Sequence, residues 1–142
     1  MPNTAYDRYL ETEVLAADPL KLVCLLYRGA LEASHSARIC IQDGDISGRS
    51  RNINRAWSIL AELAASLDHS QGGQLSRRLA GLYAYLQTRL IEANVQQSPV
   101  PLGEVETLLS ALAEAWHAAQ AASSQASPEF QGEYEVAALS VG

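Results

Sequence analysis

The sequence predicts an all-α protein, an antiparallel up-down four-helix bundle with a short extra N-terminal helix. Four segments carry apolar side chains with the 3.6-residue period of a helix, over residues 18–42, 48–68, 74–96 and 101–122. Short runs rich in Gly, Pro, Asp and Ser separate these segments, and short loops are typical of antiparallel neighbours in a bundle. No segment alternates apolar and polar residues for long enough to indicate a strand.

The first residues of the chain contain the apolar and aromatic stretch TAYDRYLETEVLAA. Tyr6, Leu10 and Val14 recur in it at helical spacing, with Tyr9 beside Leu10. A helix this short is marginal in water unless it packs against something. We therefore interpret residues 1–17 as an N-terminal lid segment that lies in a groove, with a frayed chain end as the alternative.

The segment 18–42 is expected to be the central helix. Asp18 can cap its first backbone N–H groups, and Pro19 suits the first helical position because no donor is needed there. The weakly polar arc of this helix spans roughly 200°, whereas one core contact requires about 100°. That arc is formed by Leu22, Val23, Leu25, Leu26, Tyr27, Gly29, Ala30, Leu31, Ala33, Ser34, Ser36, Ala37, Cys40 and Ile41. Such a helix is either central or contacts both the core and a partner.

Two turns are expected to separate the next two helices from their neighbours. Asp43-Gly44-Asp45 predicts the first, with Gly44 in a left-handed conformation, and residues 69–73 form the second. The helix between the turns has a stripe of Ile53, Ala56, Trp57, Leu60, Leu63, Ala64 and Leu67. The helix after them has a stripe of Leu75, Leu79, Leu82, Tyr83, Leu86, Leu90 and Ala93.

The sequence Ser98-Pro99-Val100-Pro101 breaks the chain, and Pro101 is expected to begin the last helix. The apolar stripe of that helix comprises Val105, Leu108, Leu109, Leu112, Trp116 and Ala119. We expect both tryptophans, Trp57 and Trp116, in the core. Residues 123–142 are rich in Ser, Ala, Gln and Glu, which predicts a flexible tail after a bundle of residues 18–122.

Composition and charge exclude several classes of partner and location. The net charge is -6 and the pI about 4.9, whereas nucleic acids and anionic membranes select for basic patches. No signal peptide and no apolar run of about 18 residues is visible, so we expect a cytoplasmic protein. Cys24 and Cys40 lie on one predicted helix about 24 Å apart, which is too far for a disulfide.

One group of residues matches the inventory of a di-iron carboxylate bundle. Glu32-Ala-Ser-His35 and Glu114-Ala-Trp-His117 are Glu-x-x-His pairs on two helices, and Glu62 and Glu92 lie on the other two. Helical geometry directs the glutamates and the first histidine away from the apolar stripes, so they cannot share one metal ion. We expect solvated surface charges and no metal ligand, with a metal-binding bundle kept as an alternative.

Motifs for catalysis are missing from the sequence. It has no G-x-S-x-G, no phosphate-binding glycine loop followed by Lys-Ser or Lys-Thr, and no Cys-x-x-Cys. His69 stands between Asp68 and Ser70, but neighbours in sequence do not form a catalytic triad. We therefore predict that the protein is not an enzyme and uses no cofactor.

Several short motifs follow one another over about residues 5–120. They are Tyr9-x4-Val14-x2-Ala17-x-Pro19, Leu22, Leu26-Tyr27-Arg28-Gly29-Ala30-Leu31, Ser66-Leu67-Asp68, Leu82-Tyr83-x-Tyr85, Arg89-Leu90-x2-Ala93-Asn94, Glu104-Val105 and Ala115-Trp116. In this order they resemble the FliS family of flagellin export chaperones. Arg28 departs from the family pattern, where Asp or Asn is frequent, and we expect it to tune partner contact rather than the fold.

The resemblance implies a monomeric bundle that binds the C-terminal segment of flagellin in the cytoplasm and keeps it soluble until type III export. It also implies that the N-terminal segment covers part of the groove and competes with the client. An export-gate component is a second candidate partner. We predict partner contacts from Tyr9, Leu10, Val14, Leu22, Leu26, Tyr27, Leu31, Tyr83, Leu86 and Leu90. Core positions are the alternative for Leu26, Tyr27 and Tyr83, and a self-associating helical adaptor is the alternative function.

Overall fold

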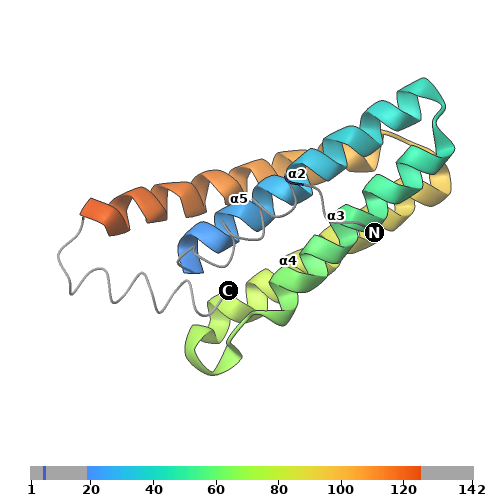
Figure 1. Ribbon diagram of the computed structural model, residues 1–142. Helices are drawn as coiled ribbons and strands as arrows, with labels where there is room; N and C mark the ends of the chain where they lie inside the picture. The colour runs from blue at the N-terminus through green and yellow to red at the C-terminus, as the bar shows by residue number, and fades with distance from the viewer. Residues whose placement is uncertain (1–4, 6–18, 126–142) are drawn as a thin grey trace.

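The computed structural model describes residue 5 and residues 19–125 of the chain. In this part the chain forms four helices and no strand, which confirms the predicted four-helix bundle (Figure 1). The helices are α2 (Pro19–Asp43), α3 (Ile46–Ala65), α4 (His69–Gln96) and α5 (Val100–Gln125). The predicted lid, the capping residue Asp18 and most of the predicted tail lie outside the described residues, so the predicted division of the chain stays a prediction.

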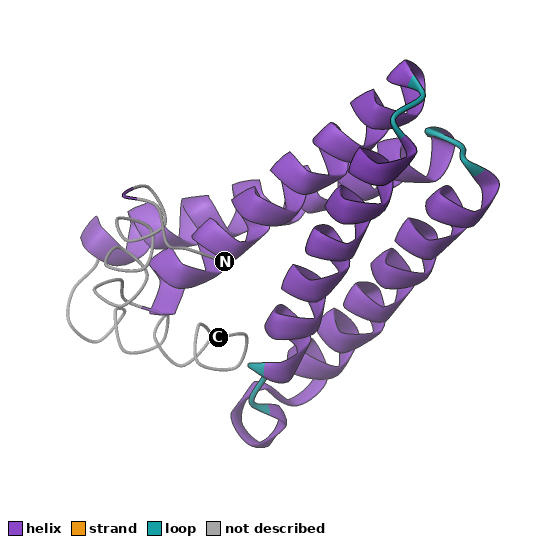
Figure 2. Ribbon diagram, turned by 45° about the vertical axis from the view of Figure 1, so that its right-hand side comes forward, coloured by secondary structure: helices purple, strands orange, loops and turns teal. Residues whose placement is uncertain are grey.

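The helices pack in a ring in which each contacts two others. α2 lies against α3 and α5, and α4 completes the ring by contacting α3 and α5. Figures 1 and 2 show α2 and α5 side by side as one pair, and α3 and α4 as a second pair. Two neighbours therefore share the wide apolar arc of α2, which accounts for much of its width without a partner.

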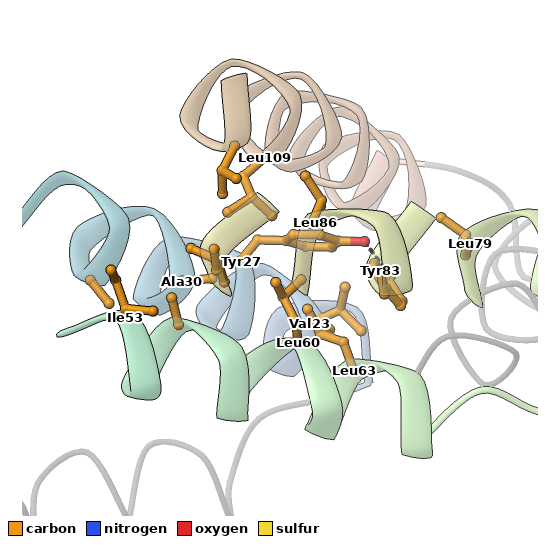
Figure 3. Packing of buried hydrophobic residues seen from close by; sticks show 14 of the residues in the cluster. Val23, Tyr27, Ala30, Ile53, Leu60, Leu63, Leu79, Tyr83, Leu86 and Leu109 are labelled. Atoms are coloured by element: carbon orange, nitrogen blue, oxygen red, sulfur yellow. Dashed lines mark hydrogen bonds between the residues drawn. The ribbon is translucent and has the colours of Figure 1, made fainter. Parts of the chain in front are cut away.

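Among the described residues, the core contains twenty buried apolar side chains, which come from all four helices and, at Leu67, from the turn between α3 and α4 (Figure 3). Their largest fully buried members are Tyr27, Tyr83, Ile53, Leu60, Leu63, Leu86, Leu90, Leu102, Leu109, Val23 and Val105. Trp116 is buried as predicted, but the prediction for Trp57 was wrong, because 39% of its surface is exposed. Trp57 lies at the edge of the α3 stripe, where its backbone carbonyl accepts a hydrogen bond from Gln87 of α4.

Side-chain caps determine where two of the helices begin. Asp45 caps α3 by accepting from the backbone N–H of Gly48 at 2.9 Å, and Gly44 adopts the predicted positive φ of 73°. Asp68 caps α4 by accepting from the backbone N–H of Ser70 at 3.0 Å. A break at Gly73, with φ 55° and ψ -127°, separates the first turn of α4 from its long part. The loop predicted at residues 69–73 is therefore a short helical turn that ends at this break.

Gly48 is required where α3 begins beside α2. A Cβ atom at this position would lie 2.8 Å from the Sγ of Cys40 and from the Cγ of Asp45, and closer still to an Asp45 carboxylate oxygen. We expect Gly48→Ala to displace the capping carboxylate and lower the free energy of unfolding by about 1–2 kcal/mol. Urea unfolding measures this change.

Gly81→Ala is the matched control for that substitution. A Cβ atom at Gly81, which is exposed on α4, would meet nothing within 4 Å. Alanine there should raise the free energy of unfolding by about 0.5–1 kcal/mol because glycine weakens a helix interior. Equal effects of the two substitutions would contradict the importance of the Asp45 cap.

Candidate partner-binding groove

A groove of about 450 Å³ runs between α2 and α5. Its walls come from one face of each helix, at spacings of three and four residues along both. The α2 wall comprises Lys21, Cys24, Leu25, Arg28 and Leu31, and the α5 wall comprises Ala113, Glu114, His117 and Gln120. The ten residue steps from Lys21 to Leu31 correspond to about 15 Å along a helix axis, or nearly three turns.

The groove combines partly buried apolar side chains with an exposed polar rim. Leu25, Leu31 and Ala113 are half-buried, and Leu31 and Ala113 also pack against the core. The ionisable lining residues are exposed, and they are Lys21, Arg28, Glu114 and His117. An apolar strip bordered by charged groups is the arrangement that receives the apolar face of an amphipathic helix.

Beneath the groove, Tyr27 of α2 meets Tyr83 of α4 inside the bundle. Both side chains are 0% exposed, their ring centroids are 6.3 Å apart, and their hydroxyl groups are hydrogen-bonded to each other (Figure 3). Burial raises the pKa of Tyr27, and its hydrogen bonds to Tyr83 and Trp116 oppose that rise only in part. Burial is also the main cause that raises the pKa of Tyr83. The pair therefore stays neutral and joins α2 to α4 across the ring.

This tyrosine pair predicts a loss of stability at alkaline pH. The folded protein retains both phenolic protons above the ordinary tyrosine pKa of 10.0, whereas the unfolded chain releases them there. The two buried tyrosines contribute their full stabilisation below the ordinary tyrosine pKa. As pH rises beyond it, the free energy of unfolding falls by about 1.4 kcal/mol per pH unit for each tyrosine. Urea unfolding of the natural chain and of a Tyr27→Phe/Tyr83→Phe variant, at several values between about pH 8 and pH 11, measures this loss. Equal pH dependence of the two proteins would contradict the assignment.

Ion pairs join α5 to its two neighbours outside the groove. Glu106 accepts from the Nε of Arg38 at 2.6 Å and lies 3.1 Å from the Nδ1 of His35. The carboxylate of Glu104 accepts from the Nε of Arg89 at 3.2 Å. The Glu106 contacts raise the pKa of the Arg38 guanidinium, mainly through the hydrogen bond, so this pair stays charged.

The two Glu-x-x-His pairs do not converge on one site. The first directs His35 to Glu106, while Glu114 and His117 of the second lie on the groove rim. Glu92 is paired with Arg89. Within the part of the chain that the structure describes, no three side chains of His, Cys, Asp or Glu are gathered as a metal ion would require. The metal-binding alternative therefore has no assembled ligand set among these residues.

The ten residues predicted to contact a partner fall into three groups. Leu22, Leu26 and Leu31 are half-buried on α2, and Leu31 lines the groove. The interior holds Tyr27, Tyr83, Leu86 and Leu90, each 0% exposed. Outside the described residues are Tyr9, Leu10 and Val14. The role of all ten residues in binding stays a prediction. The four interior residues reach a partner only if the bundle rearranges.

Sequence reasoning missed most of the groove wall. Cys24, Leu25 and the whole α5 side were not among the predicted contacts, although Arg28 was expected to tune partner contact. Leu31 was among the predicted contacts and is a lining residue, and Arg28 was a second signal because it departs from the family pattern at a position that the structure places on the rim.

A comparison with protein families identifies the group to which the chain is related. Residues 1–123 match the family described as flagellar protein FliS. The chain belongs to the FliS family. This confirms the resemblance, and the match includes the groove and all four helices up to residue 123.

Individual FliS proteins from distant bacteria agree with this assignment. The flagellar secretion chaperone FliS of Salmonella typhimurium is 36% identical over 108 residues, which cover 75% of this chain and 80% of that protein. The corresponding chaperone of Campylobacter jejuni is 32% identical over 114 residues, or 80% and 89% of the two chains. That of Bacillus subtilis is 30% identical over 111 residues, or 78% and 82%.

Membership in the FliS family supports a chaperone role in flagellar export. The relatives are named as chaperones, which work by binding, and no catalytic activity is indicated for them. Among the described helices of this FliS-family chain, none is long and apolar enough to cross a membrane. Family membership therefore implies a protein partner in flagellar export.

Proposed function

We propose that this FliS-family chain is a cytoplasmic export chaperone for flagellin. It binds the C-terminal helical segment of flagellin, prevents premature polymerisation and delivers the subunit to the flagellar type III export apparatus. The observation that carries this proposal is an apolar groove of helical dimensions on a member of a flagellar chaperone family. An amphipathic client helix places apolar side chains over nearly three turns of α2, between the charged residues of the two rims.

The client contacts more of the bundle than the groove. A stable protein interface buries about 800 Å² on each partner, which exceeds what one short helix covers here. Further apolar surface is present on the other helix pair, where Trp57, Ile91 and Val95 are 39%, 50% and 76% exposed. A client segment that continues around the bundle would cover these side chains, and exposed apolar side chains of this kind favour a protein contact.

The N-terminal segment acts as a competing lid in this proposal. Residues 1–17 cover part of the apolar surface in the unliganded chain and leave it when the client binds. The client then shifts an existing equilibrium between covered and open forms. Tyr9, Leu10 and Val14 are the lid residues that make this contact.

Calorimetric titration tests the client and the lid together. The peptide covers about the last 40 residues of flagellin from the same organism, and the proteins are the intact chain and a chain without residues 1–16. We expect one-to-one binding with a large negative heat-capacity change, because apolar surface is buried. Tighter binding by the shortened chain is the result expected of a lid.

The same titration separates the two parts of the proposal. Equal affinities of the two proteins would reject the lid and retain the chaperone. No binding by either protein, with both shown to be helical by circular dichroism, would reject flagellin as the client.

A further inference from the structure

The segment after α5 has a composition that suits the groove between α2 and α5. Residues 126–142 follow the end of the FliS match at residue 123. They contain three glutamates and no lysine, arginine or histidine. Phe130, Tyr134 and Val141 recur in them at helical spacing, with Ala137 between the last two. The sequence of the segment therefore combines apolar residues at helical spacing with charges that are all acidic.

The groove presents charges of the opposite sign. Lys21 and Arg28 line its α2 wall, against Glu114 as the acidic side chain among the described lining residues. Complementary charges at the border of an apolar contact determine which segment binds and in which register. The N-terminal segment is less well matched, because it contains Arg8 as well as its acidic residues.

Chain length and starting point also place the segment within reach of the groove. α5 ends at Gln125, and its groove-lining residues Ala113 to Gln120 lie 5–12 residues before that end, or about 8–18 Å along the helix axis. The five residue steps from Gln125 to Phe130 span up to about 17 Å when extended. Phe130 and Tyr134 therefore reach the apolar strip after the chain reverses direction beyond α5.

We propose that residues 126–142 fold back along α5 and occupy the groove between α2 and α5 of their own chain. Phe130 and Tyr134 contact the apolar strip, and the glutamates face Lys21 and Arg28. A client that enters this groove must displace the segment. The apparent affinity of the groove for the client is therefore its intrinsic affinity multiplied by the fraction of time that the segment is undocked. The docking itself does not depend on flagellin being the client.

The thiol of Cys24 reports on occupation of the groove. Cys24 lines the α2 wall and is half-buried, and the chain's other cysteine, Cys40, is replaced by serine to leave one thiol. The rate of alkylation of Cys24 by iodoacetamide is measured in the whole chain, in a chain ending at residue 125, and in a Phe130→Ser/Tyr134→Ser variant. A segment docked about nine-tenths of the time shields the thiol about tenfold, so both changes should raise the rate about tenfold.

Matched controls separate docking from loss of structure. Ser127→Ala/Ser140→Ala changes the same segment without removing its apolar side chains, and should leave the alkylation rate unchanged. All variants should retain the helical circular dichroism of the whole chain. Unchanged alkylation after removal of residues 126–142 would overturn the proposal, and faster alkylation only after removal of residues 1–16 would assign the groove to the N-terminal segment.

A disulfide trap identifies the chain that supplies the docked segment. Gln131→Cys in the Cys40→Ser background places a thiol beside Phe130, and mild oxidation should join it to Cys24 within one chain. A disulfide-linked dimer in place of the monomeric product would show that a second copy supplies the segment, and would overturn the proposal. Neither experiment uses flagellin, so its outcome is independent of the proposed function.

Discussion

Leu25→Asp is expected to weaken binding of the flagellin C-terminal segment about a hundredfold while leaving the bundle folded. Leu25 lines the groove, is half-buried, and is not among the side chains packed against the core. The aspartate stays hydrated while the groove is open and loses water when the client covers it. An unpaired charge in an apolar contact costs several kcal/mol, and a hundredfold loss corresponds to about 2.8 kcal/mol. Calorimetric titration measures the change in dissociation constant.

Ile39→Asp is the control on the same helix. Ile39 is 41% exposed on α2 and does not line the groove. We expect its replacement to leave the dissociation constant within about threefold of the original value, since charged surface positions outside a contact have little effect. Similar losses for Leu25→Asp and Ile39→Asp would show that the groove is not the principal contact.

Leu86→Ala is expected to lower the free energy of unfolding by about 2–5 kcal/mol, a large part of the total for a domain of this size. Leu86 is 0% exposed on α4 and packs in the core with Tyr83 (Figure 3). Its truncation leaves a cavity that the neighbouring helices fill only in part. Ile91→Ala on the same helix, at a side chain that is 50% exposed, should cost less than about 1 kcal/mol. Urea unfolding of both variants measures the difference.

The Leu86→Ala variant also tests whether Leu86 binds the partner directly. As an interior residue, Leu86 should affect client affinity only through the fraction of unfolded protein, so the folded Leu86→Ala variant should bind nearly normally. A large loss of affinity in the folded variant would show that the bundle rearranges to expose Leu86. In that case the partner contacts predicted for the interior residues would gain support.

The helices were predictable because local chemistry determines them. Gly44 supplies the positive φ that a turn between two helices needs, and the last helix begins at Val100, one residue before the expected Pro101. Helical periodicity also identified most of the core. It failed at Trp57, because a residue at the edge of an apolar stripe is buried or exposed according to how closely the next helix approaches, which one helix's sequence does not determine.

The site was harder to predict because burial and binding use the same residue types. The wide arc of α2 predicted two contacts, and in the structure two neighbouring helices, α3 and α5, supply them. The groove appears only when the faces of α2 and α5 are placed together, so Ala113 and His117 gave no signal on their own. Tyr83 and Leu90 match family motifs, yet both lie in the interior, where a motif residue can be retained for folding alone.

The most direct test of the chaperone account is flagellin polymerisation itself. Purified flagellin from the same organism is induced to polymerise, and light scattering follows filament growth with and without an equimolar amount of this protein. The account predicts that the natural chain suppresses growth by occupying the C-terminal segment, and that Leu25→Asp suppresses it far less. Filament growth at the same rate with and without the natural chain would contradict the account.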